Sequence, residues 1–293
     1  MIQTDLSRRL GLRYPVVCAP MFIISCKEML LACAEAGILG AMPALNARTP
    51  EALREDLNWV RERTDKPFAV NMTIAMADPD RREADLRLLE ELEVPVWVTS
   101  YGNPEGMVQR AHASGALVFH DVITLRHARK AHAAGVDAII AVSAGAGGHA
   151  GRITPFALWP WLKQELDTAI IAAGAISTGA QVAAALTLGA DLAYMGTRFI
   201  ASTECAASQA YKDLVVASGP EDIVYTDQIS GVNANFLKST LPSQRPDSPL
   251  PAKRWRDVWS AGQGVAQVHE VKPIESIVED LVREFHDATA RFR

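Results

Sequence analysis

Eight short apolar segments recur along the chain and constrain its fold more than any other feature. Each has the length of a β-strand, and they span residues 15–20, 37–43, 68–72, 94–100, 116–122, 137–143, 169–177 and 191–196. They are continuously apolar rather than alternating with polar residues. Strands of this kind are buried on both faces, which is typical of a parallel sheet covered by helices.

Amphipathic segments of helix length lie between these runs, at residues 50–64, 78–93, 104–114, 124–134 and 178–188. Many begin with Ser, Thr, Asp or Pro and several end at Gly, which are helix start and stop signals. Eight strand-helix units predict an α/β fold, a closed (βα)8 TIM barrel. The alternative is an open doubly wound sheet, but no GxGxxG motif opens a helix after an early strand.

The length of 293 residues suits one barrel domain over the whole chain. We expect the barrel to occupy residues 14–218 and a C-terminal extension to occupy 219–293. In the extension the sequence predicts a loop over 225–241, a proline-rich passage over 241–255 and a final helix over 273–293. We expect the extension to wrap the barrel.

The composition indicates a cytoplasmic protein that acts on small molecules. The formal net charge is -5, which offers no basic surface for nucleic acid. The cysteines Cys18, Cys26, Cys33 and Cys205 show no metal-type spacing, so no metal site is expected and the thiols are interpreted as reduced core residues. Residues 168–190 carry no charge, but small residues dominate them, so we expect no membrane span.

The segment "SAGAGGHAGR" over 143–152 carries His149 as its one imidazole among glycines and alanines. Such residues let a flat ligand approach the backbone closely, which makes His149 a catalytic candidate. A plain glycine-rich turn is the alternative.

Two further glycine sites follow the seventh and eighth strands, at Gly174-Ala175 and Gly196-Thr197. Amide groups at these loops form the usual phosphate pocket of a TIM barrel. FMN suits this arrangement, because its phosphate would bind there and its flat ring would cross the mouth toward His149. The alternative that these glycines only tighten turns stays open.

Six motifs together resemble the nitronate monooxygenase family: "APM" at 19, "NM" at 71, "AGGHAG" at 146, "AAGAIS" at 172, "GADLAYMGTRFIAS" at 189 and "SGVNANFLKSTL" at 230. The resemblance runs over nearly the whole chain. The pairing of GGHxG with MGTRF is shared with flavin-dependent enoyl-ACP reductases and quinone reductases of the same superfamily.

The resemblance implies an FMN enzyme that oxidises alkyl nitronates with O₂ to carbonyl compounds and nitrite. It makes His149 the catalytic residue. It assigns flavin contacts to Pro20, Met21, Asn71, Gly147, Gly148, Gly174, Ala175, Gly196, Thr197 and Gln263. Around the mouth we expect a substrate pocket with Phe22, Tyr101, His120 and Asp121.

Two positions depart from the family pattern. Relatives often read GG at Gly174-Ala175, so one phosphate contact is expected to be looser here. Some relatives carry lysine where this chain has Asp121, which makes Asp121 a candidate partner for His120 or for substrate, with a core hydrogen-bonding role as the alternative.

The expected partners are a nitronate, or a neutral nitroalkane if His149 acts as general base, together with O₂. A homodimer is left open. Two rival functions also remain: an NAD(P)H-dependent flavin reductase acting on a quinone or an enoyl thioester, and a flavin-free barrel that binds a phosphate ligand.

Overall fold

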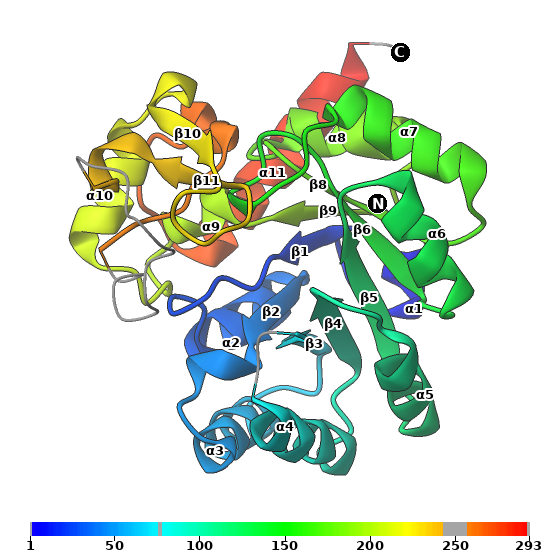
Figure 1. Cartoon of the computed structure of the whole chain (residues 1–293). Helices are drawn as coiled ribbons and strands as arrows, with labels where there is room; N and C mark the ends of the chain where they lie inside the picture. The colour runs from blue at the N-terminus through cyan, green and yellow to red at the C-terminus, as the bar shows by residue number, and fades with distance from the viewer. Residues whose placement is uncertain (1, 76–77, 243–256, 292–293) are drawn as a thin grey trace.

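The computed structural model describes residues 2–75, 78–242 and 257–291, and its central element is a closed parallel barrel (Figure 1). The barrel strands are β1 (Val16–Cys18), β2 (Leu39–Pro43), β3 (Phe68–Thr73), β4 (Val96–Ser100), β5 (Leu117–Val122), β6 (Ala138–Val142), β8 (Ala169–Ala173) and β9 (Leu192–Met195). The first and last strands pair in parallel, with Val17 opposite Tyr194, and this pairing closes the barrel. The TIM-barrel prediction is confirmed.

Helices alternate with the strands and surround the barrel. They are α2 (Lys27–Ala36), α3 (Pro50–Arg61), α4 (Pro79–Glu91), α5 (Glu105–Ala113), α6 (Leu125–Ala133), α7 (Pro155–Glu165), α8 (Gly179–Thr187) and α9 (Thr197–Ile200), preceded by α1 (Asp5–Arg9). Threonine side chains cap several of them, as the start signals predict: Thr49 caps α3, Thr124 caps α6 and Thr178 caps α8.

Side chains of the barrel strands form two apolar layers. Val17, Phe119 and Leu192 belong to the layer inside the barrel. Their immediate neighbours along the strands, such as Cys18 and Val118, belong to the layer between the barrel and the helices. Because successive strand residues point to opposite faces, the parity of a position decides whether a side chain at a strand end faces the barrel mouth.

The segment that follows β9 adds a small antiparallel sheet beside the barrel. Strand β10 (Ile223–Thr226) pairs with β11 (Ala234–Leu237), which pairs with β7 (Gly148–His149). The expectation of a loop over 225–241 is therefore wrong for these two strands. The proline-rich passage 241–255 lies outside the described residues after its first two positions.

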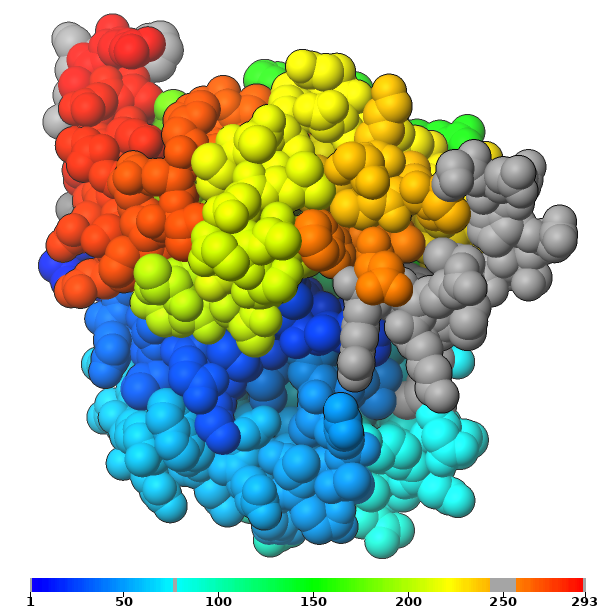
Figure 2. Space-filling view, turned by 90° about the vertical axis from the view of Figure 1, so that its left-hand side faces the viewer, coloured from blue at the N-terminus to red at the C-terminus, as the bar shows by residue number. Residues whose placement is uncertain are grey.

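Helix α10 (Gln209–Ala217) and the final helix α11 (Ile274–Ala290) complete the extension. In the space-filling view, the yellow and orange segment after β9 packs against the blue N-terminal part of the chain (Figure 2). The final helix predicted over 273–293 is confirmed over Ile274–Ala290, and the last two positions of the prediction lie outside the described residues.

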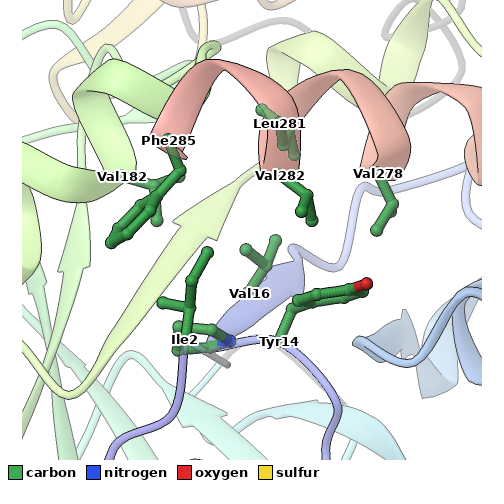
Figure 3. Close-up of a pocket in the computed structure, with 9 residues that line it drawn as sticks. Ile2, Tyr14, Val16, Val182, Val278, Leu281, Val282 and Phe285 are labelled. Carbon is green, nitrogen blue, oxygen red and sulfur yellow. The ribbon is translucent and has the colours of Figure 1, made fainter. Parts of the chain in front are cut away.

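Helix α11 packs against α8 and α2 through one apolar face. Its buried residues Ile274, Ile277, Val278 and Leu281 recur with the spacing of one helix face. Below this face an apolar hollow lies beside Val16, the first residue of β1, with Ile2 and Phe285 in its wall (Figure 3). The hollow belongs to the packing of α11 and lies away from the carboxyl ends of the strands.

Candidate active site

The carboxyl ends of the barrel strands bring most of the expected site residues to one mouth. Asn71 lies two residues after Ala69 on β3, so its side chain points to the inside of the barrel as that of Ala69 does. It is buried, and its Nδ2 donates a hydrogen bond of 3.2 Å to the Val98 carbonyl on β4. Asp121 shares the inward parity of Phe119 on β5. A carboxamide on β3 and a carboxyl on β5 therefore lie at the same end of the barrel, with β4 between the two strands.

The loops after β8 and β9 provide backbone donors. Within the described residues, the amide groups of Gly174, Ala175, Gly196 and Thr197 donate no hydrogen bond to the protein. The hydroxyl of Ser177 is also buried without a partner. Gly174, Ser177 and Thr197 are buried. Since buried donors are nearly always paired in a native structure, this cluster fits an anionic group such as a phosphate.

Ala175 adopts a left-handed backbone with φ of 53°. This conformation favours glycine, because a Cβ crowds the following carbonyl. A glycine here would avoid this crowding, so the alanine carries some backbone strain.

The C-terminal extension covers the glycine loops by backbone contacts. The amide of Gly262 donates to the Thr197 hydroxyl at 2.9 Å, and the amide of Gln263 donates to the Gly145 carbonyl at 2.9 Å. A Cβ at Gly147 would lie 2.9 Å from the Gly262 nitrogen. The exposed side chain of Gln263 lies beside Gly145, with Oε1 3.0 Å from the position of a Cβ there.

This contact changes the interpretation of the glycine-rich segment. Gly147 lacks a side chain because the tail backbone packs against it. Gly148, with φ of 66°, is the position where added atoms would meet open space. Of Gly147 and Gly148, only Gly148 therefore fits the expectation that the loop lacks side chains so that a ligand can approach it.

His149 lies directly after this opening, on β7, opposite Ala234 of β11. Its Nε2 is 3.3 Å from the Ser230 hydroxyl, and its ring meets the Tyr101 ring edge-on at 5.0 Å. Burial lowers the pKa of His149 to about 4. The imidazole is thus neutral at physiological pH.

Asp121 and Tyr101 form a second polar group in the mouth. The Asp121 Oδ1 atom and the Tyr101 hydroxyl are buried, and neither has a hydrogen-bond partner in the described chain. Burial raises the pKa of Asp121 to about 7. Burial and the Asp121 charge together raise the pKa of Tyr101 and that of Tyr194, an inward residue of β9.

His120 does not join this group. Its side chain points to the outer layer, where Nδ1 shares a hydrogen bond of 2.8 Å with the Thr99 hydroxyl. Burial and the neighbouring His127 lower the pKa of His120 to about 4. His120 is thus separated from Asp121, although the two are adjacent in sequence, because they lie on opposite faces of β5.

The loop after β1 places its residues at the rim. The amide of Met21 donates to the Ser25 hydroxyl at 2.8 Å, so the Met21 N–H is already used within the protein. The Met21 sulfur approaches Gly196, at 3.7 Å from the position of a Cβ there. Pro20 is partly exposed, and Phe22 is 47% exposed at the rim.

Sequence reasoning missed Ser177, Tyr194, Ser230 and Asn235. The Asn235 amide donates to the Ala146 carbonyl at 2.7 Å and so fixes the glycine loop. Two-residue alternation from Leu192 would have placed Tyr194 inside the barrel. The contacts of Ser230 and Asn235 join segments more than 80 residues apart, and no local pattern marks them.

In the part of the chain that the structure describes, no three His, Cys, Asp or Glu side chains gather as a metal site would require. No helix among those residues is both long and apolar enough to cross a membrane.

The fold is a TIM barrel, and the unpartnered amides of the described residues after β8 and β9 lie where enzymes of this fold commonly bind phosphate. The family model described as nitronate monooxygenase matches residues 3–246, so the chain belongs to that family. The family is flavin-dependent.

Known relatives extend over most of the chain. It is 29% identical to the nitronate monooxygenase of Paraburkholderia phytofirmans, over 83% of this chain and 79% of that protein. It is 30% identical to the (3aS,4S,5R,7aS)-5-hydroxy-7a-methyl-1-oxo-octahydro-1H-indene-4-carboxyl-CoA dehydrogenase of Mycobacterium tuberculosis. The match covers 82% of this chain and 67% of that protein.

Among solved structures, FabK of Thermotoga maritima superposes with a TM-score of 0.89 and 29% identity, and the match covers 100% of this chain and 99% of that one. The chain is therefore a member of a flavin-dependent oxidoreductase family whose members are named for different substrates.

Proposed function

We propose that this protein is an FMN-dependent nitronate monooxygenase, one barrel domain with a C-terminal extension, that oxidises alkyl nitronates with O₂ to a carbonyl compound and nitrite. The observation that supports the proposal is a neutral His149 that follows the glycine loop, in which Gly145 approaches Ala175 and Gly147 approaches Thr197. The amides of Ala175 and Thr197 donate no hydrogen bond within the described residues. When bound, FMN supplies the redox chemistry between nitronate and O₂.

The residues that would hold FMN divide by the group they suit. The amides of Gly174, Ala175, Gly196 and Thr197, with the Ser177 hydroxyl, suit the phosphate. Gly148 leaves space for close backbone approach by a flat ring, and Asn71 provides a carboxamide at the mouth. The N–H of Met21 is excluded from this set, since it donates to Ser25.

His149 would bind and orient the substrate. A neutral imidazole has one N–H donor, which suits an oxygen of an anionic nitronate. As a base, an imidazole with a pKa of about 4 is weaker than an ordinary histidine, so it is poorly suited to removing the α-proton of a neutral nitroalkane. This favours the nitronate, which is already deprotonated, over the nitroalkane.

Oxygen uptake tests the proposal. The FMN-loaded protein is mixed with ethyl nitronate or propyl-2-nitronate, and both O₂ consumption and nitrite release are followed. We expect both signals with nitronate and little with the parent nitroalkane at the same pH. Absence of both signals with either nitronate would refute the activity.

The rival reductase function has support of its own, because the superposition with FabK and the carboxyl-CoA dehydrogenase relative are as close in identity as the nitronate monooxygenase. Anaerobic mixing with NADH separates the two. Rapid bleaching of the flavin by NADH would favour a reductase, whereas bleaching by nitronate alone supports the oxidase reaction.

A further inference from the structure

Two buried polar atoms at the ends of neighbouring strands have no hydrogen-bond partner among the described residues: Asp121 Oδ1 on β5 and the Tyr101 hydroxyl just after β4. A buried polar group without a hydrogen bond destabilises the folded state. Two such atoms close enough for the Asp121 charge to act on the Tyr101 hydroxyl indicate a ligand that satisfies both.

The backbone at Tyr101 supports this interpretation. Tyr101 has φ of 57°, and Gly102 follows with φ of 148°. A left-handed conformation is strained for a residue other than glycine. Strain of this kind concentrates at ligand sites, and here the Tyr101 ring contacts His149 at the mouth.

The groups that face Asp121 are uncharged. Tyr101 approaches from the end of β4 and Tyr194 from β9, and both phenols stay protonated because their pKa values are raised. His149, beyond Tyr101, is neutral, and His120 points to the outer layer. None of the ion pairs within the described residues includes Asp121.

We propose that Tyr101 and the neutral acid form of Asp121 donate hydrogen bonds to the two oxygens of the anionic substrate, so that above neutral pH each anion bound is accompanied by one proton taken up on Asp121. This rests on the proposed function and names the substrate-binding groups for it. An ionised Asp121 would have no donor and would repel the anion, whereas the neutral carboxyl has one O–H donor. A carboxyl whose pKa is raised to about 7 gains that proton readily near neutral pH.

Inorganic nitrate is a suitable probe, because it is a planar anion that presents two oxygens as a nitronate does. Nitrate is titrated into the FMN-loaded protein between about pH 6 and pH 9, and binding is read from the flavin absorbance. We expect a constant Kd below pH 7 and a rise of about tenfold per pH unit above it, as uptake of one proton requires.

The variants separate the two donors. Asp121→Asn keeps the shape but cannot titrate, so its nitrate Kd should not depend on pH over this range. Tyr101→Phe should weaken nitrate binding at every pH and keep the wild-type slope. Asp65→Asn, at an exposed aspartate that precedes β3 and so lies at the end of that strand opposite the mouth, is the matched control and should behave as wild type. Parallel pH profiles for wild type and Asp121→Asn would overturn the proposal.

The alternative is that Tyr101 and Asp121 donate their hydrogen bonds to the electron-rich edge of the bound flavin instead of to the substrate. In that case Asp121→Asn would shift the flavin reduction potential and leave the pH dependence of nitrate binding intact. That result would also overturn the proposal.

A second measurement does not depend on nitronate turnover. In a pH titration followed by infrared difference spectroscopy, the wild-type protein should lose a protonated carboxyl band near pH 7, and Asp121→Asn should lack this band. A wild-type carboxyl that titrates only near pH 4 would refute the role of Asp121 even if the enzyme oxidises nitronates.

Discussion

The two sides of the barrel mouth are built in different ways. On the side of β6, β8 and β9, the surface is backbone: glycines, unpartnered amides and a tail that packs on them through Gly262 and Gln263. On the side of β3, β4 and β5, the surface is made of the side chains of Asn71, Tyr101 and Asp121.

The difference teaches which side suits which ligand group. A backbone surface binds an anion through fixed N–H groups. It tolerates little change at Gly145 and Gly147, because a Cβ added at either position meets the tail. A side-chain surface can differ between relatives without altering the fold. We therefore expect the backbone side to bind the cofactor and the side-chain side to set the substrate.

The largest effect is expected at His149, which stands between the two sides. His149→Asn should leave FMN affinity within about twofold and lower turnover of nitronate by about 10²-fold, as loss of one well-placed donor does. The rate of nitrite release under saturating nitronate measures this.

His120→Asn is the matched control, because His120 is also buried and also has a pKa of about 4 but lies on the outer layer. It should lose about 1 kcal/mol of stability with its hydrogen bond to Thr99 and keep its turnover. Loss of turnover in His120→Asn alone would reverse the assignment of the two histidines.

On the side of the mouth formed by the glycine loops, we expect a single added Cβ to weaken FMN binding. In Gly262→Ala the new carbon would lie 2.7 Å from the Gly147 nitrogen, so the tail must move off the loop. We expect FMN affinity to fall at least tenfold, by about 1.4 kcal/mol or more. Fluorescence quenching of FMN measures it.

Gly106→Ala serves as the control, since Gly106 lies in α5 with no atom within 4 Å of its Cβ position. It should leave FMN binding unchanged and stabilise the helix by about 0.5–1 kcal/mol. Equal effects of the two alanines on FMN would contradict the close packing of tail and loop.

On the side of the mouth formed by β3, β4 and β5, we expect the buried carboxyl of Asp121 to lower the stability of the folded protein at neutral and higher pH. Its pKa is raised from 3.8 to about 7 in the folded protein, so the folded state binds more protons between these values. Stability from this group is therefore present at low pH and is lost as pH rises through 7. We expect Asp121→Asn to be more stable than wild type at pH 8 by about 1–3 kcal/mol, and nearly equal below pH 4.

The pH dependence of the stability that His149 contributes has the opposite sign to that of Asp121. Its pKa falls from 6.5 to about 4, so the stability it contributes is present above pH 6.5 and is lost as pH falls through 4. Urea unfolding of wild type, Asp121→Asn and His149→Asn at several pH values separates the two. An Asp121→Asn variant that is less stable at pH 8 would contradict a buried, unpartnered carboxyl.

The smallest effect is expected at Ala175. Ala175→Gly relieves the left-handed backbone but adds freedom to the unfolded chain, so the net stability change should stay within about 1 kcal/mol. FMN affinity should be unchanged or higher. Weaker FMN binding would show that the alanine itself contributes to the cradle.

Strand number, helix alternation and the late glycine loops could all be predicted from the sequence, because each depends on local apolar length or on local turn residues. The two faces of β5 could also have been separated. Phe119 belongs inside the barrel, so alternation puts Asp121 inside and His120 outside.

The remaining features depend on contacts between distant segments. The strands β10 and β11 are only four residues long, and β11 pairs with a two-residue strand at His149, more than 80 positions away. The packing of Gly147 against Gly262 joins residues that are more than 110 positions apart. Neither contact has a local pattern, so the hairpin and the true reason for Gly147 come only from the structure.

The central claim is that bare amide groups after β8 and β9 hold the phosphate of the cofactor, and comparing FMN with riboflavin tests it most directly. The two molecules share the flavin ring and differ in the phosphate. Titration of the cofactor-free protein with each, followed by flavin fluorescence, should give a Kd for FMN at least about a hundredfold lower, near 3 kcal/mol, because several charge-assisted hydrogen bonds are lost with the phosphate. Equal affinity for the two would contradict the account.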